Sequence, residues 1–330
     1  MHRLKVRLAR RCRNIPLAGP ATALLERAGV RATYRLHDAL LSNPSSRKLF
    51  ATEPPRLDPA QAEVVNSLSA EGYALVPFQQ LVPDPAVWDR LTADAAAFTE
   101  QAVRDVAAEK EALAASGAPD RKKEKKLKKS YLRRRYGREV ELTLDDPWLG
   151  FGVSPAMLDI VNSYLGLWSK LIYIDQWYTV PSAAESERIA SQRWHRDYND
   201  QHLVKVFIYL SDVDEGAGPF EYVPGSARGG RYANEWRWDP LSETYPPADE
   251  FDRRIPPSAA KTLVGPAGTV ILCNTSGFHR GGFATERPRV MWVYNYVSKA
   301  SLASLCERNF RVDERKLPPD LPAAARYALT

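Results

Sequence analysis

The sequence predicts a two-part fold, in which a helical first half covers a second half built mainly of β-strands. Three helix starts are marked in the first half by Asp58-Pro59, Asp84-Pro85 and Ser154-Pro155, an N-cap residue followed by proline at the first helical position. The second half contains many short runs rich in Ile, Val, Tyr and Trp, most of them separated by Gly or Pro. Such a series is typical of an all-β sandwich or barrel.

The helices follow from these cap signals and from the stop signals that match them. The first is expected to end by Gly72, and the second to run to about Ser116, before Gly117 and Pro119. The third is expected to end at Gly166. Residues 1–9 alternate Leu, Val and Ala with basic residues, which predicts a basic amphipathic helix. Because no cleavage signal is evident, we favour a helix lying on the domain over a transit peptide or membrane-surface segment.

The strands are expected where β-branched and aromatic residues cluster between turn residues. The runs are residues 73–78, 171–180, 204–210, 220–223, 261–264, 269–273 and 290–297. The glycines and prolines between 216 and 225 are interpreted as turn residues that shape the sheet.

Composition excludes several protein classes. The 330 residues are 44% apolar and 26% charged, as in a globular protein, and no apolar run approaches the roughly 20 residues that span a bilayer. Three cysteines without paired spacing favour a reducing compartment and argue against a cysteine metal site. We therefore expect a cytoplasmic protein, with an organelle as the alternative if the basic N-terminal segment is a targeting signal.

The net charge of +6 is unevenly distributed. Residues 121–135 hold ten Lys and Arg against Glu124 alone, and residues 1–13 hold six basic side chains and no acid, which leaves the remaining chain at −9. Nucleic-acid binding would depend on these two segments alone, and we consider it improbable. We expect residues 121–135 to be a solvated, poorly ordered peripheral element, with weak contact to an anionic surface as the alternative for either segment.

His195 and Asp197 form an HxD pair, and residues i and i+2 of a strand project from the same face. The two side chains can therefore aim a nitrogen and an oxygen at one point, and a second histidine would complete a facial triad for iron(II). His279 is the preferred third ligand, since it lies among small residues after the run 269–273. His202, five residues past Asp197, is the competitor.

Several segments together resemble the phytanoyl-CoA dioxygenase family of Fe(II)/2-oxoglutarate oxygenases. The matching segments are residues 194–197, 206–220, 223–226, 278–282 and 287–289, in the family order, together with 73–78 as the family's N-terminal strand. The resemblance implies a double-stranded β-helix, a cupin-like jelly-roll core flanked by helices. We expect a basic N-terminal extension at 1–57, a single oxygenase domain at 58–310 with helical support at 58–168 and the jelly-roll core at 169–300, and a Pro/Ala-rich C-terminal tail at 311–330.

The resemblance also implies His195, Asp197 and His279 as iron ligands, and an arginine about ten residues after the distal histidine that binds the far carboxylate of 2-oxoglutarate. Arg289 has that spacing, and Arg287 is the second choice. A planar guanidinium matches a carboxylate well.

Two positions depart from the family pattern: Ala227 replaces a frequent histidine after Pro-Gly-Ser, and Met291 replaces a Ser or Thr that supports the carboxylate. The second anchor of the cosubstrate must therefore come from elsewhere, and the candidates are Tyr209, Lys205 and Trp177.

The long connection between Ser226 and Lys261 contains Trp236 and Trp238 and is interpreted either as a lid or as a structural wrap. With Trp194, these tryptophans are the candidate substrate contacts.

The function implied is that of an Fe(II)- and 2-oxoglutarate-dependent dioxygenase that uses O2, with ascorbate as reductant in vitro, to hydroxylate a C–H bond of a small-molecule or acyl substrate and release succinate and CO2. One alternative is a catalytically silent jelly-roll module that binds an acidic partner or nucleic acid through residues 121–135. Another is a metal-dependent isomerase, or a dioxygenase that does not use 2-oxoglutarate.

Overall fold

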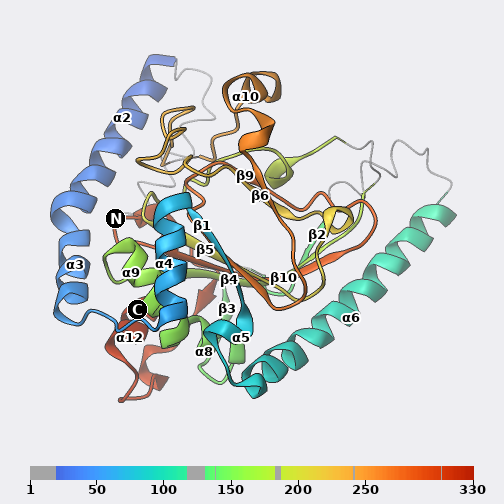
Figure 1. The fold of residues 1–330 in the computed structure, drawn as a ribbon, viewed down its shortest axis with the longest axis horizontal. Coiled ribbons are helices and arrows are strands. Elements are labelled where there is room, and N and C mark those ends of the chain that lie inside the picture. Colours follow the sequence, from blue (N-terminus) through green and yellow to red (C-terminus); the bar gives the residue numbers. More distant parts are fainter. Residues whose placement is uncertain (1–19, 117–130, 138, 183–186, 241, 306) are drawn as a thin grey trace.

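The computed structural model describes residues 20–116, 131–137, 139–182, 187–240, 242–305 and 307–330 (Figure 1). The α-helices are α2 (Pro20–Leu36), α3 (Asn43–Thr52), α4 (Pro59–Glu71), α5 (Phe78–Leu81), α6 (Pro85–Ala115), α8 (Pro147–Gly152), α9 (Pro155–Leu165), α10 (Ala248–Arg254), α11 (Leu302–Leu305) and α12 (Ala323–Leu329). The strands are β1 (Tyr73–Pro77), β2 (Leu132–Arg134), β3 (Val140–Glu141), β4 (Lys170–Thr179), β5 (Leu203–Tyr209), β6 (Phe220–Tyr222), β7 (Lys261–Leu263), β8 (Thr269–Cys273), β9 (His279–Arg280), β10 (Arg289–Val297) and β11 (Phe310–Arg311).

Two antiparallel sheets contain most of the strands of the second half of the chain, and β1 and β2 from the first half join the larger one. The larger is six-stranded in the order β1-β8-β5-β10-β4-β2, and the smaller has the order β7-β6-β9. The central strand β10 pairs Arg289 with Thr179 of β4 and Met291 with Tyr209 of β5. A separate parallel pair joins β11 to β3. The expected antiparallel sheets flanked by helices are thus present, although helix exceeds strand over the chain, at about 42% against 20%, so strands dominate only the second half.

The two faces of the large sheet have different partners, because side chains alternate along each strand. Val206 and Trp292 point into the main core, which α4, α5, α8 and α9 cover. On the opposite face, Phe207 and Met291 pack with Phe220 of the small sheet and form a second core between the sheets. Trp292 also stacks on Trp148 of α8 with ring centroids 4.0 Å apart, which adds about 1 kcal/mol to the burial of the rings.

The helices predicted from cap signals form where expected. Asp58 caps α4 in a capping box with Gln61, and Gly72 ends it in the left-handed conformation. Asp84 accepts a hydrogen bond from the Ala86 amide at the start of α6, which is 31 residues long. In Figure 1 α6 runs along one edge of the molecule and α2 along the opposite edge.

The prediction for residues 121–135 is wrong for the part that the structure describes. Leu132–Arg134 form β2, an edge strand of the large sheet, and Arg133 pairs with Glu109 of α6. Arg135 pairs with Asp94 of α6 at 2.5 Å. Acids on α6, more than 20 residues away in sequence, compensate charges that have no local partner. Residues 121–130, like the helix expected at 1–9, lie outside the described residues.

Both ends of the described chain pack on the domain. Leu329 and Ala328 of α12 belong to the main core, so the Pro/Ala-rich segment 311–330 is not a loose tail. Asn43 of α3, within the predicted extension, is fully buried and donates a hydrogen bond to Ser298 at 3.0 Å. Neither α2 nor α3 was predicted.

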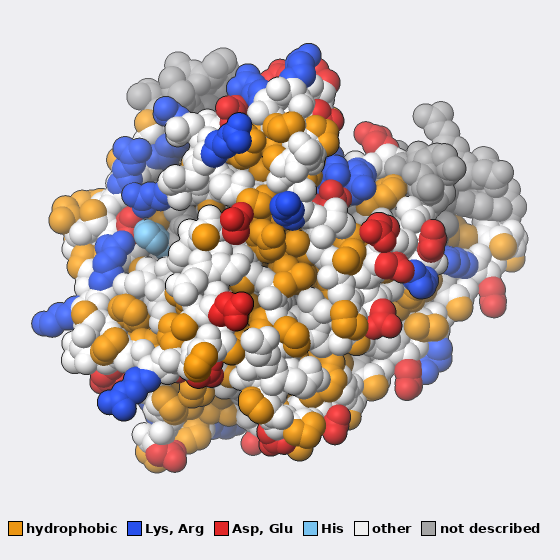
Figure 2. Space-filling view, viewed as in Figure 1, with side chains coloured by type: hydrophobic (Ala, Val, Ile, Leu, Met, Phe, Trp, Pro, Cys, Tyr) orange, Lys and Arg blue, Asp and Glu red, His pale blue; other side chains and the backbone are white. Residues whose placement is uncertain are grey.

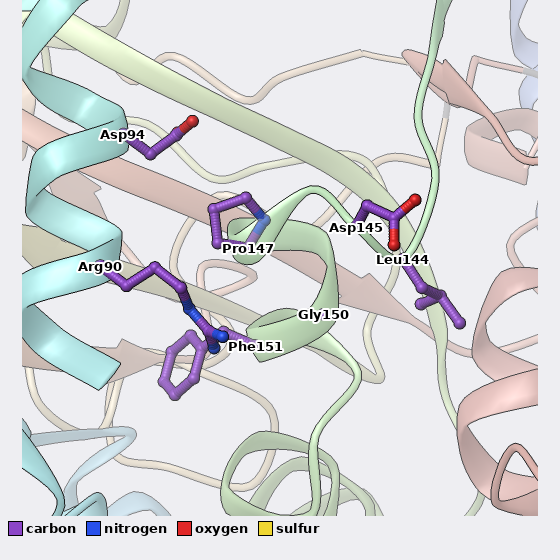
Figure 3. A pocket seen from close by; sticks show the side chains of 7 residues that line it. All are labelled: Arg90, Asp94, Leu144, Asp145, Pro147, Gly150 and Phe151. Atoms are coloured by element: carbon purple, nitrogen blue, oxygen red, sulfur yellow. The ribbon is translucent and has the colours of Figure 1, made fainter. Parts of the chain in front are cut away.

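Among the described residues, no helix combines the length and apolar character that crossing a membrane requires. A cavity of 530 Å³ lies between α6 and α8, lined in part by Arg90, Asp94 and Phe151 (Figure 3). It is on the helix-covered side of the large sheet and contains none of the predicted metal ligands.

Candidate metal centre

The structure brings His195, Asp197 and His279 together at one end of the space between the two sheets. His279 begins β9, and His195 faces it in an isolated antiparallel bridge with two amide-to-carbonyl hydrogen bonds of 3.0 Å. The Asp197 amide donates to the Thr275 carbonyl at 2.9 Å. His195 and Asp197 therefore lie on a short extended segment rather than the regular strand that was expected, but the i, i+2 geometry still places both side chains on one side.

The donor atoms are spaced for one metal ion. One ligand atom from each residue lies within 4.8 Å of the others, and the three residues are only 3–4% exposed. Nε2 of His195 is 3.8 Å from Asp197 Oδ1, and Nε2 of His279 is 3.6 Å from Asp197 Oδ2. Two imidazoles and one carboxylate are the facial donor set of non-haem iron(II) sites.

The outer nitrogens of both imidazoles hydrogen-bond to backbone. Nδ1 of His195 donates to the Arg193 carbonyl at 2.9 Å, and Nδ1 of His279 donates to the Gly277 carbonyl at 3.0 Å. A proton fixed on Nδ1 leaves the Nε2 lone pair free, as a metal ligand requires. The residues present therefore fit a divalent metal.

Electrostatics favour the same protonation states. Burial and the neighbouring His195 lower the pKa of His279 to about 3, despite the opposing effect of Asp197, so the imidazole is neutral. Burial would raise the pKa of Asp197, but Lys205 and the two histidines outweigh it and hold that pKa below its ordinary value. The centre thus offers the neutral imidazole of His279 and an ionised carboxylate.

Lys205 of β5 supplies the positive charge nearest to the centre. Its Nζ is 2.6 Å from Asp197 Oδ2, and its side chain is 17% exposed. Because the carboxylate has two oxygens, Asp197 can hold a metal with one and keep Lys205 on the other. The structure thus places Lys205, one of the predicted cosubstrate anchors, directly beside a metal ligand.

Arg289 is a buried cation at the first position of β10. The residue is 3% exposed, and its Nη1 donates to the Gly218 carbonyl at 2.7 Å. Burial lowers its pKa, and only tyrosines, chiefly Tyr209, oppose that effect, so no acid among the described residues neutralises it. By contrast, the Arg287 side chain is 59% exposed and paired with Asp214 on the surface. Of these two arginines, it is Arg289 that is placed to receive an anion inside the domain.

The other two predicted anchors lie on the same inner face of the sheet. Tyr209 is buried beside Arg289, and its hydroxyl donates to the Leu263 carbonyl at 2.7 Å. Burial raises the pKa of Tyr209, so the hydroxyl stays neutral. Trp177 of β4 donates through Nε1 to the Tyr173 hydroxyl at 2.9 Å.

The three predicted substrate tryptophans are not grouped around the metal ligands. Trp194 and Trp236 stack on Phe251 of α10, with ring centroids 5.0 and 5.9 Å away, in a separate aromatic cluster. Trp238 donates through Nε1 to the Asp197 carbonyl at 2.8 Å, and so contacts the backbone of the metal-binding segment, residues 195–197. Most of the long connection thus wraps the outside of the centre.

His202 is not a competing ligand, because its Nε2 lies 3.2 Å from Asp38.

Sequence reasoning missed one contact of the centre. Tyr245, in the connection after Ser226, stacks on the His195 imidazole with ring centroids 5.2 Å apart and an interplanar angle of 18°. It is 50 residues from its partner in sequence. The only available signal was that the connection is rich in aromatic residues.

Comparison with known proteins agrees with this geometry. A sequence model described as Phytanoyl-CoA dioxygenase (PhyH) matches residues 60–291, well over half of the chain and all three candidate ligands. The chain belongs to the phytanoyl-CoA dioxygenase family. The resemblance noted from the separate motifs is thereby confirmed.

The individual relatives are distant. L-proline trans-4-hydroxylase of Streptomyces griseoviridis is 27% identical over an alignment of 168 residues, and the match covers 44% of this chain. The aligned part spans about three-fifths of that relative, 61% of its length. Two solved structures are EctD from S. alaskensis with 2-oxoglutarate and 5-hydroxyectoine, and HygX from Streptomyces hygroscopicus with nickel and 2-oxoglutarate. EctD is 19% identical, with a TM-score of 0.42 over 82% of this chain and 92% of EctD. HygX is 15% identical, with a TM-score of 0.42 over 74% of this chain and 88% of HygX.

Proposed function

We propose that this chain is an Fe(II)- and 2-oxoglutarate-dependent dioxygenase that hydroxylates a C–H bond of a small molecule. The observation that carries the proposal is that two features lie between the same two sheets. One is the buried set of His195, Asp197 and His279, and the other is the buried Arg289, which has no acidic partner among the described residues. Family membership supports the same reaction class.

The donor set fits the metal, and Arg289 fits the cosubstrate. A three-residue facial set leaves three coordination positions for exogenous ligands. A buried guanidinium without a carboxylate partner is costly unless a ligand supplies the opposite charge. The far carboxylate of 2-oxoglutarate has that charge and the planar shape that a guanidinium matches. Tyr209, in contact with Arg289, is the better candidate for the second anchor than Trp177, whose Nε1 already has a partner.

When bound, iron(II) with 2-oxoglutarate and O2 supplies an oxidant that converts a C–H bond to an alcohol, with release of succinate and CO2. The chain's own residues organise that chemistry. His195, Asp197 and His279 would hold the metal, and Lys205 balances the charge of Asp197. The burial of all three ligands excludes bulk water from that side.

We propose further that the two sheets are the halves of a double-stranded β-helix. Their strands are antiparallel, they share one apolar core, and the candidate ligands lie at the end of that core. An eight-stranded jelly roll has this arrangement.

The substrate is proposed to be small and polar rather than a long acyl chain. Tyr173 of β4 and Lys205 of β5 flank Asn295 of β10 in register, which forms a polar row across the inner face of the sheet. Asn295 is 3% exposed, and its side-chain oxygen has no partner among the described residues. Asp175, also buried on this face, accepts a hydrogen bond from Tyr173 at 2.8 Å. A relative named for hydroxylation of an amino acid, L-proline, is consistent with such a polar surface.

The deciding experiment measures succinate formed from 2-oxoglutarate by the full chain with iron(II), O2 and ascorbate. We expect slow uncoupled turnover without substrate, and faster turnover with a suitable small polar substrate. Absence of succinate from iron-loaded protein, with and without a panel of amino acids and related small molecules, would contradict the proposal. Salt-sensitive nucleic-acid binding that persists in Asp197→Ala would instead favour the silent binding module. Product formation that does not consume 2-oxoglutarate would favour an isomerase or another dioxygenase class.

A further inference from the structure

A second cavity, of 390 Å³, has five arginines in its lining. Its lining includes Arg31, Arg35, Arg196, Arg228 and Arg237, and no acidic residue. These arginines come from segments far apart in the sequence: α2, the metal-binding segment, the loop after β6 and the connection that follows it. The cavity is therefore created by the tertiary fold and was not visible as a charge run.

The helix α2 presents one face to this cavity. Arg31, Tyr34 and Arg35 are spaced i, i+3 and i+4, so they lie on the same side of the helix. The Tyr34 hydroxyl donates to the buried Asp200, which fixes that side against the segment following Asp197. In Figure 2 basic side chains gather along the edge of the molecule that α2 forms.

Most of this positive charge has no acidic partner. Among the described residues, Arg35, Arg228 and Arg237 form no ion pair, and Arg31 is only within 4.0 Å of Asp239. Arginines that line one cavity repel one another, and salt screens exposed charges only beyond about 8–10 Å. An anionic ligand would remove that repulsion.

Arg196 adds a buried cation to the exposed ones. It is 2% exposed, and backbone carbonyls of Ser226, Ser276, Tyr232 and Glu235 accept its Nη hydrogens. Its Nε has no partner among the described residues. Carbonyl dipoles and the Phe278 ring, 3.8 Å from the guanidinium carbon, hold the side chain in place, and no carboxylate among the described residues forms an ion pair with it.

This cavity is distinct from the metal centre. Arg196 lies between His195 and Asp197 on an extended segment, so its side chain projects to the opposite side from the two ligands. Trp238, which lines the cavity, hydrogen-bonds to the Asp197 carbonyl at 2.8 Å. The two sites share one stretch of backbone and face away from each other.

We propose that this arginine cavity binds a small molecule carrying a phosphate or diphosphate group. Phosphate carries up to two negative charges at neutral pH and has acceptor oxygens that several guanidinium groups can share. A monocarboxylate would satisfy only one or two of the arginines. Tyr34 and Trp238, with ring centroids 5.1 Å apart, provide an aromatic wall for the organic part of the ligand. The volume of 390 Å³ is in the range of small-molecule sites.

The test is calorimetric titration of the full chain with inorganic pyrophosphate, without iron or 2-oxoglutarate, so that its result is independent of the proposed catalysis. We compare the native protein with the Arg228→Ala/Arg237→Ala double variant. The matched control is Arg104→Ala/Arg253→Ala, which removes two exposed helical arginines elsewhere. We expect the first double variant to weaken pyrophosphate binding by about tenfold or more, and the control by less than about twofold.

Thermal melts by circular dichroism establish that both double variants remain folded. Native binding should weaken as salt rises, and acetate should bind much more weakly than pyrophosphate. Failure of the native protein to bind pyrophosphate, or equal weakening in both double variants, would overturn the proposal. Acetate binding as tight as pyrophosphate binding would overturn the assignment to phosphate.

Discussion

Arg289→Ala is the substitution that most directly separates the proposed cosubstrate site from the rest of the fold. The native guanidinium is 3% exposed and has a carbonyl and a tyrosine, but no acid, as partners. In the variant the far carboxylate of 2-oxoglutarate would be buried without a countercharge. Stranding one partner of a buried charged pair costs roughly 2–4 kcal/mol. The dissociation constant of 2-oxoglutarate should therefore rise by roughly 30- to 1,000-fold.

Two further variants refine this prediction. Arg289→Lys keeps the charge but loses the planar fork, so its effect should be intermediate. Gly282→Ala should also weaken 2-oxoglutarate binding, because an added Cβ would lie 2.8 Å from Arg289 Nη2. Gly282 has a φ of +78°, so the alanine would in addition strain the backbone.

The assay is the dependence of succinate formation on 2-oxoglutarate concentration, together with direct titration of the metal-loaded protein. Arg287→Ala is the matched control, since that arginine is two residues away, exposed and paired with Asp214. Its effect should be less than about threefold, because exposed ion pairs contribute little. Equal and small effects of Arg289→Ala and Arg287→Ala, in variants with unchanged thermal melts, would refute the assignment.

Four other substitutions test the centre and its support. Asp197→Ala should abolish both the thermal stabilisation by iron(II) and succinate formation, and full retention of either would contradict its role as a ligand. Lys205→Gln should destabilise the metal-free protein by roughly 1–3 kcal/mol, because the buried Asp197 carboxylate loses its cation. Metal binding should then stabilise the variant more than the native protein, since the metal replaces that cation. An unchanged metal-induced shift in melting temperature would argue against this. Tyr245→Ala should weaken metal binding by about tenfold in a metal titration while Tyr245→Phe does not, whereas equal losses would exclude a stacking role. Arg135→Ala should lower the free energy of unfolding by roughly 1–2 kcal/mol in urea melts, and no change would mean that its pairing with α6 is energetically neutral.

Local features of the sequence predicted α4, α6 and α9 and most of the strands. The caps at Asp58 and Asp84 and the stop at Gly72 act through hydrogen bonds and backbone conformations within a few residues, so their effect can be read without the fold. Strand positions followed from clusters of β-branched and aromatic residues. The motif order indicated the family, and with it His195 and His279.

Tertiary structure alone decided which side chains act together. Arg287 and Arg289 look alike in sequence, but packing buries only Arg289. The pairing of Arg135 with α6 and the stacking of Tyr245 on the metal-binding segment join residues more than 40 positions apart. Such contacts depend on how helices and sheets pack, and the energy of a charge depends on its burial. No local pattern encodes either, which is why the basic segment was misjudged and the arginine cavity appeared only in the folded chain.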